Sequence, residues 1–549
     1  MKKWQIYSLA AVVALAALAG TAYIFRKDVI LYAVATRARD ATPVAPNREI
    51  VWQQGPAEAA EGQRPPNVVL ILADDLGFND ISLYGGGIIE TPNIDALARS
   101  GANFSTAYAG TAACAPSRAM IMTGRYGTRT GFEFTPTPPG MTRIVDMFYN
   151  DGSRFHELLV DREAAAKAPP FREQGLPGEE ITLAEVLKPA GYHNIHIGKW
   201  HLGNSEEFLP NAQGFDESVM LESGLFLPED HPDAVNAKLP FDPIDQFLWA
   251  RMQYATSYNA GEWFEPKGYL TDFYTDEAVK AIEANRNRPF FLYLAHWAVH
   301  TPLQASKADY DALSHIEDHR ERVYAAMIRA LDRSVGRVME TLKENGLDDN
   351  TIVIFSSDNG GPGYIGLPEI NKPFRGWKLT YFEGGIRVPL FVRWPGRIGE
   401  GVERDVPVAH LDLFPTIAAA AGATLPGDRV IDGIDILPFA KDAEVEEPGR
   451  AIFWRDGHYH AMRKDGWKLQ FAERPNKVWL YNLNEDPTEQ NNLAEAMPEK
   501  VAELRALVDA HNATQRDPLF PAVAEMPVTI DKTLEEEATE EDEYIYWPG

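Results

Sequence analysis

The sequence predicts an α/β protein in which helices flank a large, mixed, mostly parallel sheet. A small C-terminal α+β subdomain with an antiparallel sheet is expected to follow it. From about residue 65, short apolar runs alternate with longer helical patterns, as units of strand, helix and strand require. From about residue 428, short strand patterns follow one another before a last helical stretch.

Polar side chains follow four of the apolar runs, at the point where each predicted strand ends. The four runs are residues 68–72, 195–197, 290–294 and 352–355. The polar residues beyond them are Asp74, Asp75, Lys199, His201, His296, His300, Asp358 and Asn359. Ligands of open α/β sheets bind beyond the carboxyl ends of the strands. We therefore expect these side chains to meet at one edge of the sheet.

Length and charge restrict the classes of function. The 549 residues allow one large domain and a smaller one. The 52 basic and 80 acidic residues give a formal net charge of −28, which argues against nucleic acid as a partner. The same charge argues against adhesion to an anionic membrane through a basic face. It also repels anionic substrates at long range, so an anion site needs local cations.

The N-terminus has the pattern of an export signal or a membrane anchor. A mostly apolar run at residues 6–25 follows two lysines and is closed by Arg26-Lys27. Ala17-Leu18-Ala19 would suit cleavage, but the run is long enough to span a bilayer, which favours an uncleaved anchor. Either interpretation predicts an exported protein, located in the periplasm or at the cell surface.

The expected domain boundaries follow these changes of pattern. Residues 1–27 are assigned to the signal or anchor, 28–64 to a linker and 65–427 to the main domain. Residues 428–515 are assigned to the subdomain, with strands at 451–454, 460–463, 467–471 and 478–481 and a helix at about 498–511. Residues 516–549 are rich in acidic side chains and are expected to form a solvated, partly disordered tail.

The only cysteine of the chain, Cys114, opens a chemically distinctive stretch, Cys114-Ala115-Pro116-Ser117-Arg118. Pro116 favours the first turn of a helix and Gly124 its C-cap. Cys114 is therefore expected at a helix N-terminus, where free N–H groups and the dipole favour anions. Arg118 adds a planar cation suited to an oxyanion. A buried, inert thiol is the alternative interpretation of the cysteine alone.

Two pairs of residues present hard oxygen ligands at separate strand ends. Asp74-Asp75 and Asp358-Asn359 are typical of calcium or magnesium sites rather than of sites for soft metals. Adjacent carboxylates repel each other unless a cation lies between them. Either pair alone is also common in turns. Their positions after two apolar strands favour a metal site.

The Cys-x-Pro-Ser-Arg stretch, followed by Thr123-Gly124-Arg125, resembles the signature of the type I sulfatases of the alkaline-phosphatase-like superfamily. Further blocks in the same order resemble that family at residues 198–203, 300–302, 375–380 and 383–389. The resemblance covers most of residues 66 to about 512. It implies that Cys114 is converted to formylglycine by a formylglycine-generating enzyme, and that the hydrated aldehyde is the nucleophile of a calcium-dependent sulfatase.

The resemblance also implies a role for each site residue. One Ca²⁺, preferred here over Mg²⁺, would be bound by Asp74, Asp75, Asp358, Asn359 and the modified Cys114. The catalytic residues would be Cys114, Arg118, Lys199, His201, His300 and Lys378. Both lysines would hold sulfate oxygens, and His201 would assist the nucleophile or the release of sulfate. His300 would protonate the leaving alcohol, with His296 as the competing choice.

The substrate is the least determined part of this interpretation. A sulfated carbohydrate is the expected substrate of an exported enzyme, and an aryl sulfate is the alternative. Two other functions stay open. One is a formylglycine-dependent phosphodiesterase or phosphonate monoester hydrolase, tuned by the inserts at about 134–180 and 204–265. The other is a non-catalytic protein that binds sulfated glycans with Cys114 unmodified.

Overall fold

A ten-stranded sheet forms the centre of the part of the chain that the computed structural model describes, residues 25–60, 62, 64–222, 224–441, 445 and 449–549. Five neighbouring strands run parallel: β12 (Thr351–Ser357), β1 (Asn67–Ala73), β10 (Phe290–Ala295), β5 (His193–Gly198) and β6 (Glu217–Leu221). Beyond β12 the sheet continues with β13 (Leu390–Arg393), β2 (Ala102–Phe104) and β14 (Val402–Arg404), and beyond β6 with β8 (Thr256–Tyr258) and β9 (Trp263–Phe264). β13 and β8 are antiparallel to their neighbours β12 and β6, so the predicted mixed, mostly parallel sheet is confirmed.

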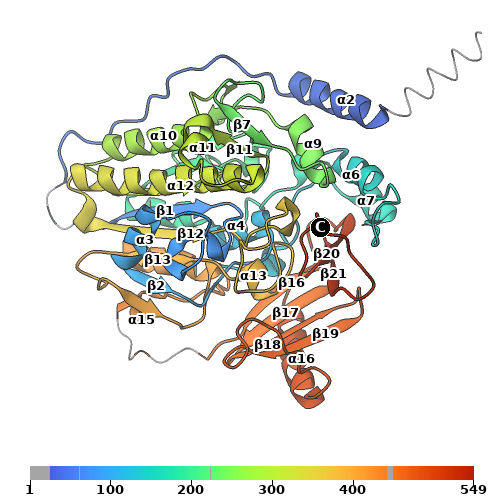
Figure 1. Cartoon of the computed structure of the whole chain (residues 1–549). Coiled ribbons are helices and arrows are strands. Elements are labelled where there is room, and N and C mark those ends of the chain that lie inside the picture. The colour runs from blue at the N-terminus through green and yellow to red at the C-terminus, as the bar shows by residue number, and fades with distance from the viewer. Residues whose placement is uncertain (1–24, 61, 63, 223, 442–444, 446–448) are drawn as a thin grey trace, which may run out of the picture.

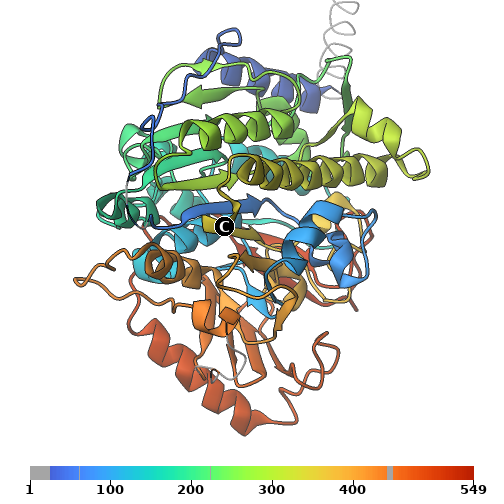
Figure 2. The same cartoon turned by 90° about the vertical axis from the view of Figure 1, so that its left-hand side faces the viewer.

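Strand β1 is buried along its whole length, and apolar from Val68 to Ala73, because helices cover both faces of the sheet. Val69 and Ile71 pack on the side of α3 (Pro92–Arg99), α10 (Leu270–Ala284) and α12 (His319–Glu344). Val68 and Leu70 pack on the side of α4 (Cys114–Thr123), α8 (Leu183–Leu187) and α14 (Leu413–Ala421). Figures 1 and 2 show α10 and α12 lying together over one face.

The four strands predicted to carry the polar residues are neighbours in register. Ala73 of β1 pairs with Ser357 of β12, and Ala295 of β10 pairs with Gly198 of β5. β1 and β10 are themselves adjacent and parallel. The segments after these strands therefore start from one edge of the sheet, as expected.

The C-terminal subdomain contains the predicted antiparallel sheet. Its strands are β16 (Ile452–Asp456), β17 (Tyr459–Lys464), β18 (Trp467–Ala472) and β19 (Lys477–Asn482), each paired with the next. Helix α16 (Pro498–Asn512) packs Leu504 and Val508 against Met462 and Leu469 of this sheet. The sheet and helix are coloured orange to red in Figure 1.

The acidic segment at residues 516–549 differs from the expected solvated tail. It forms β20 (Ala524–Thr529) and β21 (Tyr544–Pro548), which pair with each other, and β20 also pairs with β4 (Leu159–Val160). Its carboxylates have partners: Arg375 binds Asp531 and Glu543, and Lys532 binds Asp542 at 2.7 Å. The expectation of disorder was wrong because these charges are neutralised by cations of the folded chain.

The predicted N-terminal signal or anchor lies almost entirely outside the described residues. Among the helices that the structure describes, none is long and apolar enough to cross a membrane. The predicted linker contains α2 (Arg26–Ala41), which packs against α9 (Pro243–Arg251). Further on, Trp52 is buried and donates its indole N–H to Glu277 at 2.9 Å. Much of this segment is therefore attached to the main domain.

Candidate active site

Cys114 is the first residue of α4, as predicted from the proline and glycine that follow it. The helix ends at Gly124, which takes the left-handed conformation with φ of 66°. Every residue of α4 is buried, so the helix is held between the sheet and the rest of the chain. This packing fixes the thiol at the edge of the sheet where the parallel strands end.

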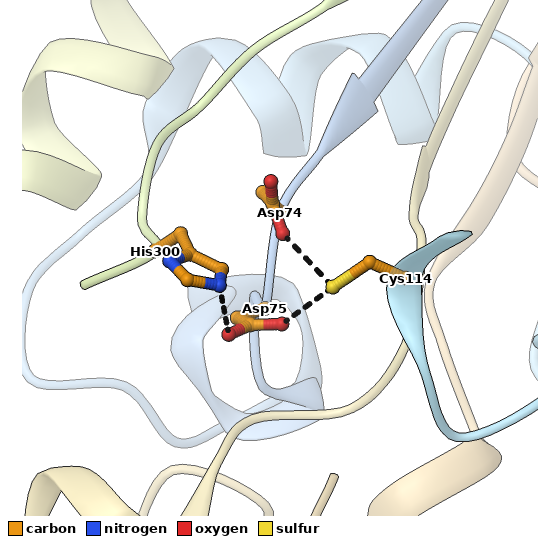
Figure 3. A group of neighbouring side chains, drawn as sticks. All are labelled: Asp74, Asp75, Cys114 and His300. Atoms are coloured by element: carbon orange, nitrogen blue, oxygen red, sulfur yellow. Dashed lines mark hydrogen bonds and ion pairs between the residues drawn. The ribbon is translucent and has the colours of Figure 1, made fainter. Parts of the chain in front are cut away.

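The cysteine sulfur lies against the two aspartates that follow β1. Its Sγ atom is 3.6 Å from Asp74 Oδ1 and 3.7 Å from Asp75 Oδ1 (Figure 3). Lys378 Nζ lies 3.0 Å from the same sulfur, although the two residues are 264 positions apart in the sequence. The thiol, two carboxylates and an ammonium group therefore form one buried cluster, from which Cys114 and Lys378 reach the lining of a cavity.

Two lysines pair with these two aspartates. Lys199 Nζ is 2.7 Å from Asp74 Oδ2, and Lys378 Nζ is 2.7 Å from Asp75 Oδ1. Lys199 directly follows β5, whereas Lys378 comes from a loop after β12. The local cations demanded by the overall negative charge are therefore present at the site.

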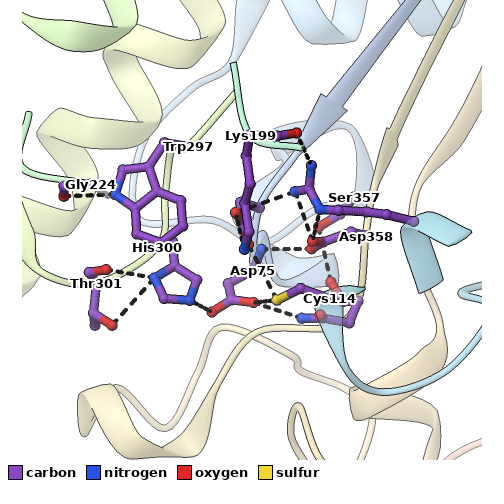
Figure 4. A network of polar contacts seen from close by, with 12 residues as sticks. Asp75, Cys114, Lys199, Gly224, Trp297, His300, Thr301, Ser357 and Asp358 are labelled. Carbon is purple, nitrogen blue, oxygen red and sulfur yellow. Dashed lines mark hydrogen bonds and ion pairs between the residues drawn. The ribbon is translucent and has the colours of Figure 1, made fainter. Parts of the chain in front are cut away.

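Arg118 connects three of the strand ends, at which Figure 4 labels Asp75, Lys199 and Asp358. Its Nε and Nη2 atoms lie 2.9 and 2.8 Å from Asp358 Oδ2, and Nη2 lies 3.3 Å from Asp74. Its Nη1 donates to the Lys199 carbonyl at 3.1 Å. Burial alone would lower the pKa of Arg118, but Asp358 and Asp74 raise it, so the guanidinium stays charged.

Burial acts in the same direction on the pKa values of the two carboxyls and the thiol, but their charged neighbours differ. Burial and the neighbouring Asp358 raise the pKa of Asp74 to about 7. Burial would also raise the pKa of Asp75, but Lys378 and His300 hold it below its usual range. Burial and Asp358 raise the pKa of the Cys114 thiol, so little thiolate exists at neutral pH. As an unmodified thiol, Cys114 would be a poor nucleophile.

The structure brings His300, and not His296, to the cavity. His300 Nε2 is 3.6 Å from Asp75 Oδ2, and its ring stacks on Trp297 with centroids 4.1 Å apart. Burial lowers the pKa of His300 to about 3, although Asp75 opposes the shift. His296 instead shares a hydrogen bond with Ser334 of α12 at 2.8 Å. Sequence reasoning favoured His300, and the geometry supports that choice.

His201 also faces the cavity that contains Cys114. It takes a left-handed backbone conformation with φ of 64°, and its Nδ1 atom is buried without a hydrogen-bond partner. Burial lowers the pKa of His201 well below its ordinary value, with Lys199 and Arg118 acting in the same direction. A neutral imidazole with an unsatisfied nitrogen is suited to exchange a proton with a bound molecule.

The oxygen ligands of the site fit a hard divalent cation. Ligand atoms of Asp74, Asp75, Cys114 and His300 all lie within 4.8 Å of one another. Asn359 donates its amide N–H to Asp75 Oδ1 at 2.8 Å, while its own Oδ1 is buried without a hydrogen-bond partner. Buried carboxylates beside an unsatisfied amide oxygen are the donors that calcium and magnesium prefer.

Two aromatic residues of the site were missed by sequence reasoning. Tyr364 donates its hydroxyl to Asp75 Oδ2 at 2.9 Å. Trp297 stacks on His300, and Lys199 Nζ lies 4.7 Å from its ring centroid. Both line the cleft, which has a volume of about 630 Å³. Aromatic residues usually fill the core, so neither residue type indicates a site by itself. The only signal in the sequence was position: Tyr364 closely follows Asp358-Asn359, and Trp297 closely precedes His300.

Family models match most of the chain. The model of the sulfatase domain matches residues 66–423. The model of the C-terminal region of N-sulphoglucosamine sulphohydrolase matches residues 376–513.

Curated relatives and solved structures agree with this match. The chain is 34% identical over 407 residues to N-acetylgalactosamine-6-sulfatase of Rattus norvegicus, covering 73% of this chain and 70% of the relative. It is 31% identical over 511 residues to steryl-sulfatase of Homo sapiens, covering 80% of each. The crystal structure of Ps i-CgsB in complex with k-i-k-neocarrahexaose superposes with a TM-score of 0.69 at 31% identity, covering 83% of this chain and 95% of that one.

The chain belongs to the sulfatase family of the alkaline-phosphatase-like superfamily, and it is a sulfuric ester hydrolase.

Proposed function

We propose that the protein hydrolyses sulfate monoesters with a formylglycine made from Cys114 and one bound Ca²⁺. The observation that carries this proposal is the position of the Cys114 sulfur, within 3.7 Å of both Asp74 and Asp75 and 3.0 Å from Lys378. Formylglycine, when present, supplies a hydrated aldehyde that attacks sulfur through one hydroxyl and expels sulfate with the help of the other. A simple thiol or alcohol has no second hydroxyl for that release.

The cation would be held by Asp74, Asp75, Asp358, Asn359 and the modified residue 114. It would supply positive charge for the sulfate oxygens and for an ionised hydroxyl. Calcium is preferred because the residues offer several oxygen ligands at once, whereas magnesium usually keeps more of its water. A chelator should therefore inactivate the protein, and calcium should restore it better than magnesium.

The two lysines would bind the sulfuryl group. Lys199 and Lys378 pair with Asp74 and Asp75 in this structure. A cation held by these carboxylates would take over their neutralisation, which would leave both ammonium groups free to bind sulfate oxygens. Arg118 keeps its contacts with Asp358 and holds the strand ends in place.

The proton transfers would be divided between the two histidines. His300 would protonate the leaving oxygen at Nε2, the nitrogen that faces Asp75. A bound sulfate ester adds negative charge near this ring, which favours its protonated form. His201, held neutral by burial, would take the proton of the second hydroxyl at its unsatisfied Nδ1. Asp358 would accept the proton of the attacking hydroxyl.

Maturation and export belong to the same proposal. Conversion of Cys114 needs a formylglycine-generating enzyme, which would act before the buried helix α4 has folded. The N-terminal pattern supports export to the periplasm or the cell surface, with the segment kept as an anchor. The non-catalytic alternative is not supported, because the homologous relatives are named as sulfatases.

A comparison of two nitrophenyl esters tests the proposal. We expect the matured protein to hydrolyse para-nitrophenyl sulfate faster than bis(para-nitrophenyl) phosphate, measured as kcat/KM. Cys114→Ala should lower kcat by a factor of about 10³ or more, as loss of a nucleophile does. Preference for the diester would favour the phosphodiesterase alternative, and full activity of Cys114→Ala would contradict the proposed nucleophile.

The alcohol half of the ester is not decided by the comparisons. N-acetylgalactosamine-6-sulfatase supports the expected carbohydrate substrate, as does the neocarrahexaose bound to Ps i-CgsB. Steryl-sulfatase, at similar identity, supports an apolar alcohol. The lining of the cleft itself provides a further argument.

A further inference from the structure

The cleft continues from the catalytic centre into a compartment with apolar walls. Helix α6 (Met141–Tyr149), helix α9 and strand β20 line it, and these elements lie together on one side of the molecule in Figure 1. The side chains that form this apolar wall are Met141, Val145, Ile244, Phe247, Leu248 and Met526. They belong to the two inserts and to the C-terminal segment, not to the strands that carry the catalytic residues.

The apolar wall offers little to a sugar. Apart from the catalytic lysines and histidines, the charged side chains that line the cleft are Glu222 and Arg251, which lie 3.5 Å apart and neutralise each other. The neutral polar side chains of the cleft are those of Thr42, Thr135, Thr137, Thr142, Asn204, Ser257, Thr301 and Tyr364, and none of them belongs to the apolar wall itself. Sugar hydroxyls buried against carbon would lose their hydrogen bonds to water without replacement. A second sulfate group would find no free cation along this lining.

An aromatic ring, held between His300 and Lys199, lies at the start of the route from the reacting oxygen to the wall. His300, which would protonate the leaving oxygen, stacks on Trp297 with an angle of 28° between the rings. The Trp297 indole is fixed by a hydrogen bond of 2.9 Å to the Gly224 carbonyl. A rigid aromatic face therefore lies beside the position of the alcohol oxygen.

We propose that the alcohol half of the substrate is a large apolar group, a fused-ring or long alkyl alcohol, which the apolar wall receives. This inference rests on sulfate hydrolysis at Cys114 and replaces our sequence-based preference for a sulfated sugar. The whole cleft, catalytic centre included, has a volume of about 630 Å³, which is in the range of pockets that enclose a small organic ligand. Burial of each additional methylene should raise kcat/KM roughly threefold to fourfold, until the compartment is filled.

A series of primary alkyl sulfates of increasing length tests the inference with the full, matured chain. Each sulfate is assayed below the concentration at which it forms micelles, beside a sulfated monosaccharide and a steroid sulfate. We expect kcat/KM to rise with chain length and both apolar classes to exceed the monosaccharide by at least tenfold. No dependence on length, or a better monosaccharide, would overturn the inference.

The same assays separate this inference from the proposed function. If para-nitrophenyl sulfate is hydrolysed but kcat/KM does not depend on chain length, only the apolar substrate is wrong. If no sulfate ester is hydrolysed by protein whose Cys114 has been converted, the proposed function fails as well.

A matched pair of leucine variants provides the second test. Leu248 is half-buried in the cleft, and Leu248→Gln should lower the ratio of kcat/KM for long over short alkyl sulfates by roughly tenfold, as loss of apolar contacts predicts. Leu425, 37% exposed and outside the cleft, is the control, and Leu425→Gln should leave this ratio unchanged. A ratio of this kind does not depend on the amount of folded protein. Equal ratios in both variants would contradict the proposed wall.

Discussion

At the scale of single residues, Asp75 connects more of the site than any other side chain described above. It accepts hydrogen bonds from Asn359, Tyr364 and Lys378, and it faces His300. Its backbone is left-handed, with φ of 61°, a conformation that costs a residue with a Cβ about 1–2 kcal/mol. Such strain is typical of functional sites, where the surroundings hold a residue in place.

Replacement of His300 by glutamine should slow esters with poor leaving groups most. We expect His300→Gln to lower kcat by about 10²–10⁴ for an alkyl sulfate, because the alkoxide needs a proton as it departs. The loss should be much smaller for para-nitrophenyl sulfate, whose phenolate leaves without one. His296→Gln is the control, since His296 contacts Ser334 and does not line the cleft. Equal losses for both leaving groups would show that His300 is not the acid.

Calcium should stabilise the folded protein independently of any activity. A ligand that binds only the folded state at 100 times its Kd adds about 2.7 kcal/mol. We therefore expect calcium to raise Tm above its value in EDTA, and Asn359→Leu to weaken this response by removing the unsatisfied buried oxygen. Thermal unfolding followed by circular dichroism measures both effects. An unchanged Tm in EDTA and in calcium would contradict the metal site.

At the scale of secondary structure elements, the end of β5 places Lys199 and His201. Gly198 closes this strand with φ of 111°, and a Cβ atom at this position would lie 1.9 Å from the Ala295 carbonyl oxygen of β10. Only glycine therefore lets the two strands stay in register up to the edge of the sheet. The backbone of Gly198 therefore determines where the chain leaves the sheet toward Lys199 and His201, the two side chains proposed to be catalytic.

Gly198→Ala should damage stability and activity together. We expect a loss of about 2–3 kcal/mol in the free energy of unfolding, because both the dihedral angle and the contact with β10 are incompatible with alanine. Activity of the protein that remains folded should also fall, since Lys199 moves. Gly178→Ala is the control, because its Cβ would meet no atom within 4 Å. Urea denaturation of both variants measures the difference, and equal stabilities would contradict this role.

Local sequence patterns were sufficient to predict some of these helices and strands but not others. Helix α4 was predicted by Pro116 and Gly124, which are local signals. The strands beside the site were predicted because residues buried on both faces form continuous apolar runs. Strands β20 and β21 were missed because the acidic residues near them indicated a segment exposed to solvent. The cation that pairs with one of these residues, Asp531, is Arg375, which lies 156 residues away in the sequence. Pairing across such a distance leaves no local pattern.

At the scale of the whole molecule, one buried lysine connects the C-terminal subdomain to the loop that follows Lys378. Lys468 of β18 lies 2.8 Å from Glu383 and 2.9 Å from Glu489, and all three side chains are completely buried. Glu383 begins α13 (Glu383–Ile386), five residues after Lys378. The subdomain therefore helps to hold the loop that carries Lys378, the second lysine proposed to bind sulfate.

Lys468→Met should destabilise the protein in a pH-dependent way. Removing one partner of a buried ion pair costs about 3–5 kcal/mol, because the other charge stays buried. Burial would raise the pKa of Glu383, but Lys468 and Arg387 hold it at about 2, while burial raises the pKa of Glu489 to about 7. Without Lys468 the folded state binds protons more tightly than the unfolded one, so stability should rise as pH falls.

Urea denaturation between about pH 5 and pH 8 measures this effect. The range runs from above the ordinary pKa of a glutamate to above the raised pKa of Glu489. We expect the deficit of Lys468→Met to be largest above pH 7 and to shrink toward pH 5. Lys500→Met is the control, since Lys500 pairs with the exposed Glu503 and should cost less than about 1 kcal/mol. A deficit that does not change with pH would contradict the buried carboxylates as its cause.

The position of the site could be predicted from sequence, but the shape of the cleft could not. The charged residues follow predicted strands, and parallel strands bring such positions together whatever lies between them. The apolar wall depends on how α6, α9 and β20 pack, and residues such as Met141 and Met526 carry no sign of which cavity they face. The expected sugar substrate was inferred from export alone, without the shape of the cleft, and the alkyl sulfate series tests it against the apolar alcohol.

The most direct test of the account is mass spectrometry of the peptide that contains Cys114. The protein should be purified from a host that converts sulfatase cysteines, and the peptide should be compared in active and inactive preparations. We predict that the peptide carries an aldehyde in place of the thiol, in proportion to the activity. Full activity in protein whose Cys114 is entirely a free thiol would contradict the central claim.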